Sequence, residues 1–288
     1  MSIPPMQSPA SSSAANNMIA ALLEQRTGQQ IAANRAWRIE TALKPLLRER
    51  GLNTLDELVT QLMATRTGEL SDMVVDALLN QETSFFRDAA VLDMVADAAR
   101  ELQAETPHKR LRIWCAGCST GQEPLSLAML FEERSVTNPG TQPEIVATDI
   151  SLGALARAKS GKFSQFEIQR GLSVRRMMSW FEGNGSEWTA NAELVRKVQF
   201  RQQNLAGDPP PPGKFDIVLC RNVLLYFSGS LRKQVFDTLF SAVRPGGMLV
   251  LGAGETVIGQ TDQFVPSDRF RGFYHPAAPK ADALRKAG

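Results

Sequence analysis

Arg112-Ile-Trp-Cys-Ala-Gly-Cys-Ser-Thr-Gly-Gln-Glu-Pro-Leu-Ser126 is the most informative stretch of this chain. Its first residues are typical of a buried strand, its two glycines favour a tight turn, and the residues from about Gln122 onward are typical of a helix. Three interpretations fit this pattern: a redox or metal-binding cysteine pair, a serine nucleophile, or a strand–turn–helix unit that holds a nucleotide-like cofactor. The rest of the chain has to distinguish among them.

From Lys109 onward, short apolar runs alternate with helical segments. We expect strands at Leu111–Cys115, Glu144–Thr148, Phe215–Cys220 and Met248–Leu251, and helices at about 122–133, 152–160 and 229–243. Alternation at this spacing predicts an α/β fold, in which a mostly parallel, doubly wound sheet carries helices on both faces.

The residues before this region follow a different pattern. Residues 1–16 are low in complexity, which predicts a disordered tail. From Asn17 to about Arg100, apolar residues recur at intervals of three and four, which predicts helices. We therefore expect a helical domain over 17–90, a sheet domain over 91–278 and a loose tail over 279–288.

One region interrupts the alternation of strands and helices. Between about residues 161 and 204 we expect an amphipathic helix at Val174–Phe181, and then strands at Trp188-Thr and Leu194–Gln202 that pair with each other. We interpret this region as an insert on the sheet domain.

The overall composition excludes several classes of protein. The chain has 288 residues and a formal net charge of +2, so its total charge gives no indication of nucleic-acid binding. It has no basic start followed by an apolar run, as a secretory signal would require, and no run of about 18 apolar residues that could span a membrane. Its three cysteines fit a reducing compartment. We expect a cytoplasmic monomer that does not insert into membranes.

The pair Cys115 and Cys118 gives little support to a metal or redox site. Zinc sites need about four ligands, and only Cys220, His108 and His275 remain, none of them in a second pair. Packing of the two thiols as small apolar groups is favoured, and we expect no metal.

The serine interpretation rests on Gly117-x-Ser119-x-Gly121, which has the spacing of a nucleophile elbow. Asp216 or Asp262, followed by His275, would complete a catalytic triad. Two features disfavour this interpretation. His275 lies in a proline-rich stretch before the expected loose tail, and the residues upstream of Ser119 look helical where such folds usually have strands.

The cofactor interpretation gains support from the next expected strand. Gly117 and Gly121 let the backbone approach a ligand, and the helix that begins near Gly121 offers free N–H groups. Asp149 ends the strand of Glu144-Ile-Val-Ala-Thr-Asp, where nucleotide-binding α/β units place an acidic residue on the ribose hydroxyls. The glycine spacing is not that of a nicotinamide dinucleotide site.

Four motifs then occur in order: Thr83-Ser-Phe-Phe-Arg87-Asp, Cys115-Ala-Gly-Cys-Ser-Thr-Gly-Gln-Glu123-Pro, Ala147-Thr-Asp149-Ile and Cys220-Arg221-Asn222-Val-Leu-Leu-Tyr226-Phe. With these motifs the chain resembles the chemotaxis-receptor glutamate methyltransferases, the CheR family, over about residues 17–275. The resemblance implies an S-adenosylmethionine-dependent methyltransferase fold, with an N-terminal helical domain and a small antiparallel β-subdomain inserted into the sheet domain.

The resemblance also implies a set of cofactor-binding positions. Thr83 and Arg87 would close over the methionine end of the cofactor, and Asp149 would bind the ribose. The family often has Asn two residues before the Thr; here that residue is Gln81, with Asn80 beside it, and either would make this contact. The full implied set is Gln81, Thr83, Arg87, Gly117, Glu123, Asp149, Asn204, Leu205, Arg221 and Asn222.

The implied reaction is methyl transfer to glutamate carboxylates in the cytoplasmic methylation helices of membrane chemoreceptors, with S-adenosylhomocysteine as the product. Glutamate has an ordinary pKa of about 4.3, so the acceptor is already ionised at neutral pH and needs no catalytic base. We expect Arg221 and Tyr226 to orient the acceptor carboxylate. A binding module that senses the cofactor without transferring methyl is the remaining alternative.

The helix expected around residues 34–50 offers a candidate docking face. At 100° per residue, Trp37, Lys44 and Arg48 point away from the apolar side formed by Ile39, Leu43 and Leu46, and Arg38 lies nearby. This face is either solvated or a patch for acidic methylation helices.

Overall fold

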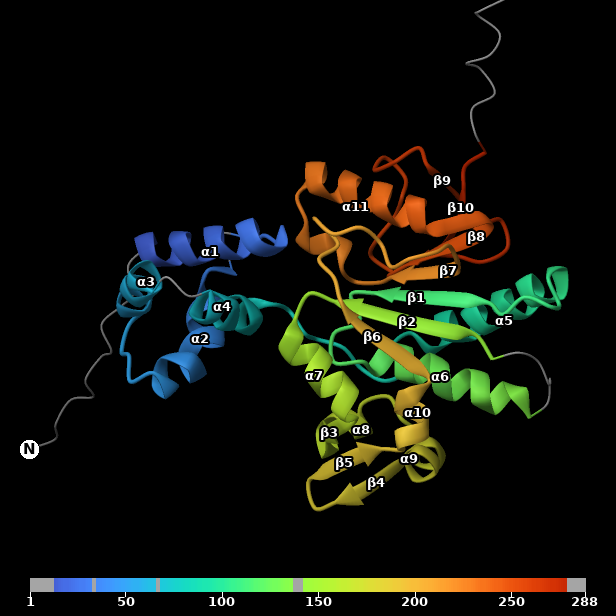
Figure 1. The fold of residues 1–288 in the computed structure, drawn as a ribbon, viewed down its shortest axis with the longest axis horizontal. Helices are drawn as coiled ribbons and strands as arrows, with labels where there is room; N and C mark the ends of the chain where they lie inside the picture. The colour runs from blue at the N-terminus through green and yellow to red at the C-terminus, as the bar shows by residue number, and fades with distance from the viewer. Residues whose placement is uncertain (1–12, 33–34, 66–67, 137–141, 279–288) are drawn as a thin grey trace, which may run out of the picture. The chain divides into compact units, whose positions relative to one another are not determined.

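The computed structural model describes residues 13–32, 35–65, 68–136 and 142–278. The chain forms two compact units: a helical unit of Met1–Asn80 and Tyr226–Ser228, and a sheet unit of Gln81–Leu225 and Gly229–Gly288 (Figure 1). The tail expected at 279–288 lies outside the described residues. Of the tail expected at 1–16, residues 1–12 lie outside the described residues, and residues 13–16 belong to the first helix, which begins at Ser13.

The helical unit contains α1 (Ser13–Thr27), α2 (Trp37–Glu49), α3 (Leu55–Ala64) and α4 (Glu69–Leu78). The start of α3 is encoded locally, because the side chain of Thr54 accepts a hydrogen bond from the backbone N–H of Glu57. The apolar faces of all four helices share one core, which includes Ile19, Leu43 and Leu58. Residues 226–228 join this unit through a backbone hydrogen bond from Gln30 N–H to the Tyr226 carbonyl, at 2.8 Å.

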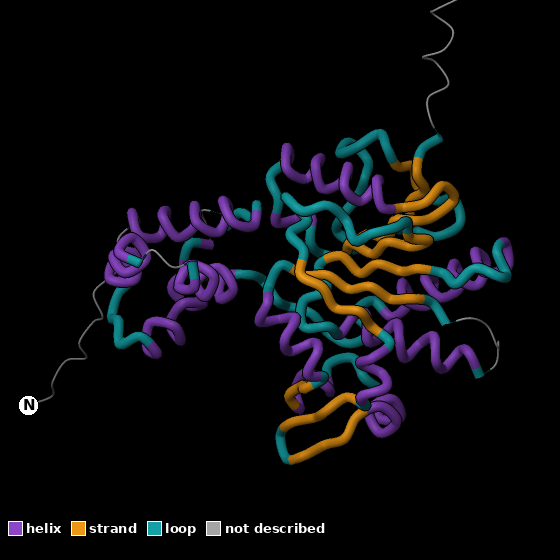
Figure 2. The backbone as a smooth tube through the Cα atoms, viewed as in Figure 1, coloured by secondary structure: helices purple, strands orange, loops and turns teal. Residues whose placement is uncertain are grey.

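The sheet unit is built on a seven-stranded sheet in the order β6-β2-β1-β7-β8-β10-β9. The first five strands in this order are parallel, and β10 runs antiparallel to both β8 and β9. The strands lie side by side, coloured orange in Figure 2. The strands are β1 (Arg112–Ala116), β2 (Glu144–Asp149), β6 (Val198–Gln202), β7 (Phe215–Cys220), β8 (Val243–Leu251), β9 (Phe264–Pro266) and β10 (Phe273–Pro276). This sheet confirms the expected α/β class.

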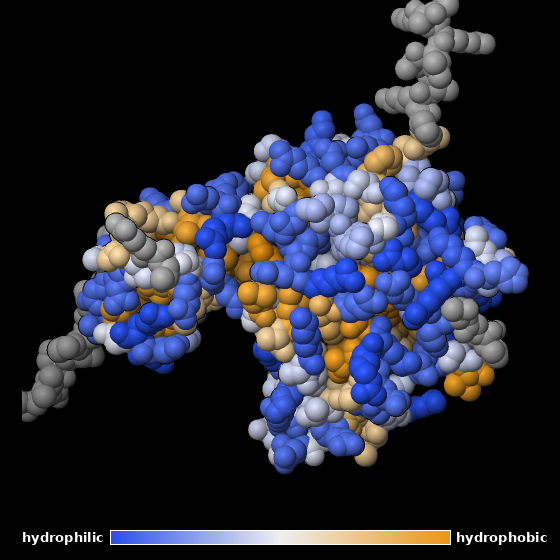
Figure 3. Space-filling view, viewed as in Figure 1, coloured by the Kyte–Doolittle hydropathy of each residue, from blue (hydrophilic) through white to orange (hydrophobic). Residues whose placement is uncertain are grey.

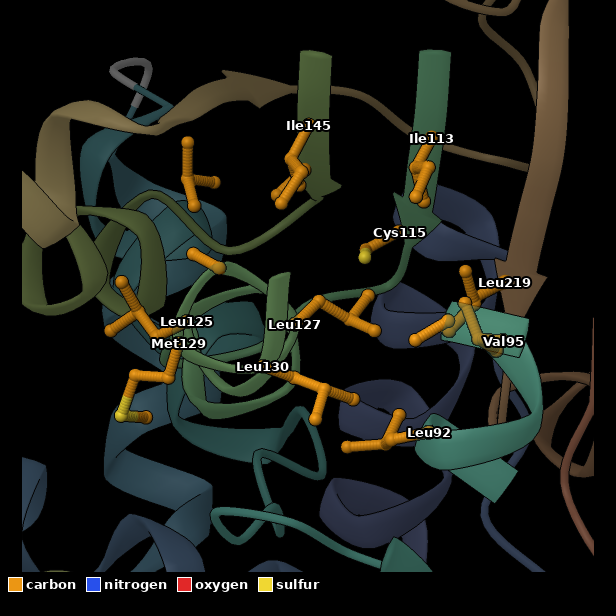
Figure 4. Packing of buried hydrophobic residues seen from close by; sticks show 14 of the residues in the cluster. Leu92, Val95, Ile113, Cys115, Leu125, Leu127, Met129, Leu130, Ile145 and Leu219 are labelled. Atoms are coloured by element: carbon orange, nitrogen blue, oxygen red, sulfur yellow. The ribbon is translucent and has the colours of Figure 1, made fainter. Parts of the chain in front are cut away.

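Four long helices accompany the sheet: α5 (Ala89–Glu105), α6 (Gln122–Ser135), α7 (Leu152–Ser160) and α11 (Gly229–Ala242). Alternate residues of β1, β2 and β7, such as Ile113, Ile145 and Leu219, share a buried core with α5 and α6 (Figure 4). Because side chains alternate across a strand, the intervening residues face the other side of the sheet.

The insert contains a separate antiparallel sheet in the order β3-β5-β4. Its elements are β3 (Lys162–Ser164), α8 (Gln165–Gln169), α9 (Val174–Trp180), β4 (Phe181–Asn184), β5 (Glu187–Ala190) and α10 (Ala192–Arg196). A small antiparallel insert is therefore confirmed.

The strand pairing expected inside the insert is wrong. The residues expected as one strand, Leu194–Gln202, divide into the end of α10 and β6, and β6 pairs in parallel with β2 of the large sheet. The helix has a local cause, because the side chain of Asn191 accepts a hydrogen bond from Glu193 N–H and caps the start of α10. The insert therefore ends before Val198, not at residue 204.

In this view the surface of each unit is mostly hydrophilic, with smaller hydrophobic areas (Figure 3). Within the described residues, no helix combines the length and apolar character needed to cross a bilayer.

Candidate active site

The turn between β1 and α6 lies at the carboxyl edge of the sheet and is held against the end of β2. The backbone N–H groups of Gly117 and Cys118 both donate to the Thr148 carbonyl, at 2.8 and 2.9 Å. Gly121 has a φ of +92°, and a β-carbon there would come within 2.8 Å of the Ala158 β-carbon in α7. Glycine is therefore required at position 121 both by the backbone and by the close approach of α7.

Asp149 connects this turn to the end of β2. Its Oδ2 accepts the backbone N–H of Ser119 at 2.7 Å, and its Oδ1 accepts the backbone N–H of Ser151 at 3.0 Å. The residue is only partly buried. A carboxylate has about four lone-pair sites, so a group of this kind can bind the hydroxyls of a ribose as well as backbone N–H groups.

Gln81 lies beside the same turn. Its carbonyl accepts a hydrogen bond from the Ser119 hydroxyl at 2.9 Å, and its Nε2 donates to the Ser151 hydroxyl at 3.2 Å. Asn80 belongs to the helical unit, where its Nδ2 donates to the Tyr226 hydroxyl. Gln81 therefore contacts the turn, and which of Gln81 and Asn80 binds the cofactor stays a prediction.

Thr83 and Arg87 lie on the segment between Gln81 and α5, and both are partly buried. The Arg87 guanidinium donates to the Glu82 carbonyl at 3.4 Å. The segment is fixed by Phe85, whose ring is fully buried and makes edge contacts with Phe163 and Phe181, at centroid distances of 4.9 and 5.4 Å.

Arg221 follows β7 and is buried, with a side chain only 1% exposed. Its two terminal nitrogens donate to Glu123 Oε2 at 2.7 Å, to Asp88 Oδ2 at 2.6 Å and to the Arg87 carbonyl at 3.1 Å. Its Nε is buried and has no hydrogen-bond partner among the described residues. The terminal nitrogens of Arg221 therefore connect Glu123, Asp88 and the backbone of Arg87, and its expected part in orienting the acceptor carboxylate stays a prediction.

The remaining implied positions lie in turns after neighbouring strands. Asn204 follows β6, and its side-chain oxygen accepts the backbone N–H of Ala206 at 3.0 Å, while Leu205 is buried. Asn222 follows β7 with a φ of +61°. The sheet thus brings the turn after β1, Asp149, Asn204 and Asn222 to one edge, since parallel strands end on the same side.

Tyr226 ends the short 3-10 helix Leu224–Tyr226 and belongs to the helical unit. Its expected contact with the acceptor stays a prediction.

Backbone strain is concentrated at this site. The described non-glycine residues with positive φ are Phe86, Asp88, Ser119 and Asn222, and each lies in a segment named above. Each is held by a hydrogen bond; the Phe86 N–H, for example, donates to the Ser126 hydroxyl at 2.9 Å. Residues in this conformation cost free energy and persist only where their surroundings fix them, and such positions cluster at functional sites.

The cysteines do not form a reactive pair. Cys115, Cys118 and Cys220 are free thiols, all buried. Burial raises the pKa of the Cys115 and Cys118 thiols well above the ordinary value, and the negative charge of Glu123 adds to the effect. Within the described residues no cluster of His, Cys, Asp or Glu could hold a metal ion. The interpretation as small apolar packing groups is confirmed.

The serine triad is excluded by the register of the sheet. Tyr274 of β10 pairs with Leu249 of β8, which pairs with Val218 of β7, which in turn pairs with Trp114 of β1. Tyr274 is therefore level with Trp114 but three strands away, which is about 14 Å at ordinary strand spacing. His275 is further from the carboxyl edge, whereas Ser119 lies beyond it. The Ser119 hydroxyl instead donates to Gln81, so it fixes the turn.

Glu255 was not expected from the sequence. It lies in the loop after β8, and its carboxylate accepts backbone N–H groups from Gly252, Asn222, Val223 and Leu224. The only signal was Gly252-Ala-Gly254 directly after an expected strand, which by itself indicates no more than a loop.

Together these residues suit an adenosyl cofactor with a charged amino-acid end. Asp149 can accept from hydroxyls, the apolar side chain of Leu205 can contact an aromatic base, and the Arg221–Glu123 pair supplies fixed charges at the neighbouring strand end.

Comparison with known proteins gives the family of this site. The family described as CheR methyltransferase, SAM binding domain, matches residues 81–271. The chemotaxis protein methyltransferase Cher2 of Pseudomonas putida is 36% identical over 247 residues, which cover 84% of this chain and 90% of that protein. Chemotaxis protein methyltransferase 1 of Pseudomonas aeruginosa is 37% identical over the same shares. The chemotaxis protein methyltransferase of Escherichia coli is 30% identical over 82% of each chain.

Proposed function

This chain belongs to the CheR family of S-adenosylmethionine-dependent chemotaxis methyltransferases, and we propose that it methylates glutamate side chains of chemotaxis receptors to give glutamyl methyl esters. The observation that carries the proposal is the Asp149 carboxylate, held by the backbone of Ser119 and Ser151 at the carboxyl edge of the sheet. Such a carboxylate suits ribose hydroxyls, and the family match covers the whole of this edge.

The cofactor would be held by residues of five segments: the one before α5 and those at the ends of β1, β2, β6 and β7. Asp149 would accept from the ribose hydroxyls, Gln81 and Thr83 would lie on one side, and Leu205 would contact the adenine. The turn from Gly117 would face the cofactor, with Asn204, Arg87, Glu123, Arg221 and Asn222 completing the set. Bound S-adenosylmethionine would supply a methyl group on a positively charged sulfur.

The acceptor requires no activation by the protein. A glutamate carboxylate is ionised at neutral pH, so its oxygen could take the methyl group that the cofactor would supply, the cofactor sulfur would keep the electron pair, and no proton would have to move. The protein therefore contributes position and removal of water, which alone can lower a barrier by several kcal/mol. We propose that Arg221 contributes by fixing Glu123 and the segment at Asp88, and that Tyr226 orients the acceptor.

We propose that α2 provides the docking surface for the receptor. Ile39, Leu43, Leu46 and Leu47 of this helix are buried, whereas Trp37 is 65% exposed. Lys44 and Arg48 are also exposed, and Arg38 is partly exposed. This basic face suits acidic helices such as the cytoplasmic methylation helices of chemoreceptors.

Three free, buried thiols support a reducing, cytoplasmic location. We propose that the protein acts there as a monomer.

The experiment is incubation of the protein with methyl-labelled S-adenosylmethionine and membranes that contain a chemoreceptor. We expect label on the receptor that is released as methanol in mild alkali, because carboxyl methyl esters hydrolyse there. Alkali-stable label would indicate transfer to nitrogen and contradict the proposal. Cofactor binding with no label on any receptor would favour a module that only senses the cofactor.

A further inference from the structure

Glu255 accepts four backbone hydrogen bonds with one carboxylate. Its Oε2 accepts from Asn222 N–H at 2.7 Å and Gly252 N–H at 2.9 Å, and its Oε1 accepts from Val223 at 3.0 Å and Leu224 at 2.8 Å. Successive backbone N–H groups that converge in this way form a concave anion site, and here the anion is a side chain of the same protein. The loops after β7 and β8 are joined by this one group.

The surrounding backbone is built to admit the carboxylate. Asn222 has a φ of +61°, which turns its N–H and those of the next two residues to the same side. A β-carbon on Gly252 would lie 2.8 Å from both Asn222 N and Glu255 Oε2. Glycine at position 252 therefore leaves the space through which the two loops approach each other.

The loop that Glu255 fixes contacts the cofactor turn at two points. A β-carbon on Gly117 would lie 2.5 Å from Val223 Cγ2, so the Val223 side chain packs directly on the first residue of that turn. Arg221, one residue before the fixed N–H groups, pairs with Glu123 at the start of α6. A shift of the loop after β7 would therefore move both ends of the turn.

We propose that Glu255 is a positioning residue for methyl transfer. It contacts neither cofactor nor acceptor, but it sets the conformation of residues 221–224 and, through Val223 and Arg221, the shape of the turn that holds S-adenosylmethionine. That this chain binds S-adenosylmethionine follows from its family. Only the effect of Glu255 on methyl transfer rests on the proposed function.

The test compares Glu255→Gln with Asp216→Asn. Gln keeps one oxygen but turns an NH2 group toward backbone donors, so two of the four N–H groups lose their acceptor. Asp216 is the matched control, because its buried carboxylate accepts the backbone N–H of Arg112 at 2.8 Å at the opposite end of β7. Affinity for S-adenosylhomocysteine is measured by calorimetry, and Tm without ligand is measured for each variant.

We expect both variants to lower Tm, but only Glu255→Gln to weaken S-adenosylhomocysteine binding. The loss of affinity should be about tenfold or more, since a small misplacement of groups in a site can reduce its performance by up to about a hundredfold. Amide hydrogen exchange should also become faster at Val223 and Leu224, while the interior of β7 stays protected. If Glu255→Gln does not fold, Gly252→Ala carries the test, because its β-carbon displaces the same carboxylate.

Two results would overturn the inference. Wild-type affinity in Glu255→Gln, together with a lower Tm, would show that the carboxylate only stabilises the fold. Equal weakening in Asp216→Asn would show that binding follows global stability. Failure of the wild-type chain to bind S-adenosylhomocysteine would instead contradict the cofactor site itself, and absence of receptor methylation with intact binding would contradict only the proposed function.

Discussion

At the candidate site, single side chains are held by their neighbours before any ligand binds. Asp149 is fixed by two backbone N–H groups, and Arg221 by Glu123 and Asp88. The Arg221 side chain is buried and pairs with both carboxylates, so removing both would leave its charge uncompensated, which is strongly destabilising. The site therefore does not have to order these groups when the cofactor arrives, and the free energy of binding is not reduced by that cost.

The three thiols lead to a prediction about reactivity. Because burial holds the pKa of Cys115, Cys118 and Cys220 well above the ordinary value, their thiolate forms are suppressed at neutral pH. We expect no modification by Ellman's reagent in the native protein at pH 8, and three equivalents after unfolding in guanidinium. Rapid reaction of one or more thiols in the native state would contradict the buried assignment.

At the scale of elements, the segment before α5 is held to the insert by aromatic packing. Phe85 contacts Phe163 of β3 and Phe181 at the start of β4, and a β-carbon on Gly171 would clash with the Phe85 carbonyl at 1.9 Å. The insert thus supports the segment that carries Thr83 and Arg87.

We expect Phe85→Ala to lower the free energy of unfolding by about 3–5 kcal/mol, the usual cost of removing a buried ring. It should also weaken S-adenosylhomocysteine binding, because the segment loses its fixed position. Urea unfolding and calorimetry check both effects. Phe240→Ala is the control, since its ring packs on Phe264, away from this segment; weakened binding in the control variant as well would contradict the specific role of Phe85.

The amino end of the sheet gives a prediction about pH. Burial acts to raise the pKa of the Asp216 carboxyl, but the Arg112 N–H and the Arg244 and Lys109 side chains outweigh it, so the pKa lies below its ordinary value. Because the pKa is lowered in the folded state, the ionised carboxylate stabilises the fold at pH values above its unfolded pKa of about 3.9. This stabilisation is lost as the pH falls through the folded pKa. The excess stability of wild type over Asp216→Asn, measured by urea unfolding, should therefore be constant near neutral pH and shrink below about pH 4. A gap that widens in acid would contradict this assignment.

Strands and helices were predictable from sequence where local signals agreed with the final pairing. The strand Phe215–Cys220 and the helix Leu152–Ser160 have the expected bounds. The start of β8 at Val243 was not predictable, because Pro245, Gly246 and Gly247 indicate a turn unless β7 is present as a partner. The parallel pairing of β6 with β2 was missed for the same reason: it depends on contacts distant in sequence.

For the whole molecule, the docking surface that we propose on α2 is the feature most sensitive to charge. We expect the triple variant Arg38→Glu, Lys44→Glu, Arg48→Glu to slow receptor methylation at low salt by about tenfold or more, since electrostatic steering raises association rates by that order. Its affinity for S-adenosylhomocysteine should stay unchanged. The effect should decline as salt screens the charges.

The control carries the same change in net charge on the sheet unit: Lys159→Glu, Lys233→Glu and Arg271→Glu, all at exposed positions. We expect this control to methylate receptors at nearly the wild-type rate. Equal slowing in the two triple variants would show that net charge matters and that α2 is not the docking surface.

The sequence predicted the cofactor class because the motif at each strand end could be compared separately with the motifs of the CheR family. What it could not supply was the network between those ends, in which Ser119 bonds to Asp149 and Glu255 bonds to Asn222. These contacts join residues 30 and 33 positions apart and form only when parallel strands place their ends together.

The turn from Gly117 to Glu123 and Asp149 together hold S-adenosylmethionine if the site is assigned correctly. Calorimetric titration of wild type and Asp149→Ala with S-adenosylhomocysteine tests this most directly, and Asp216→Asn is the stability control. We predict one equivalent bound by wild type and by Asp216→Asn, and binding weakened by about a hundredfold in Asp149→Ala, since that change removes acceptors for the ribose and for the Ser119 N–H. Equal affinity in all three proteins would contradict the claim.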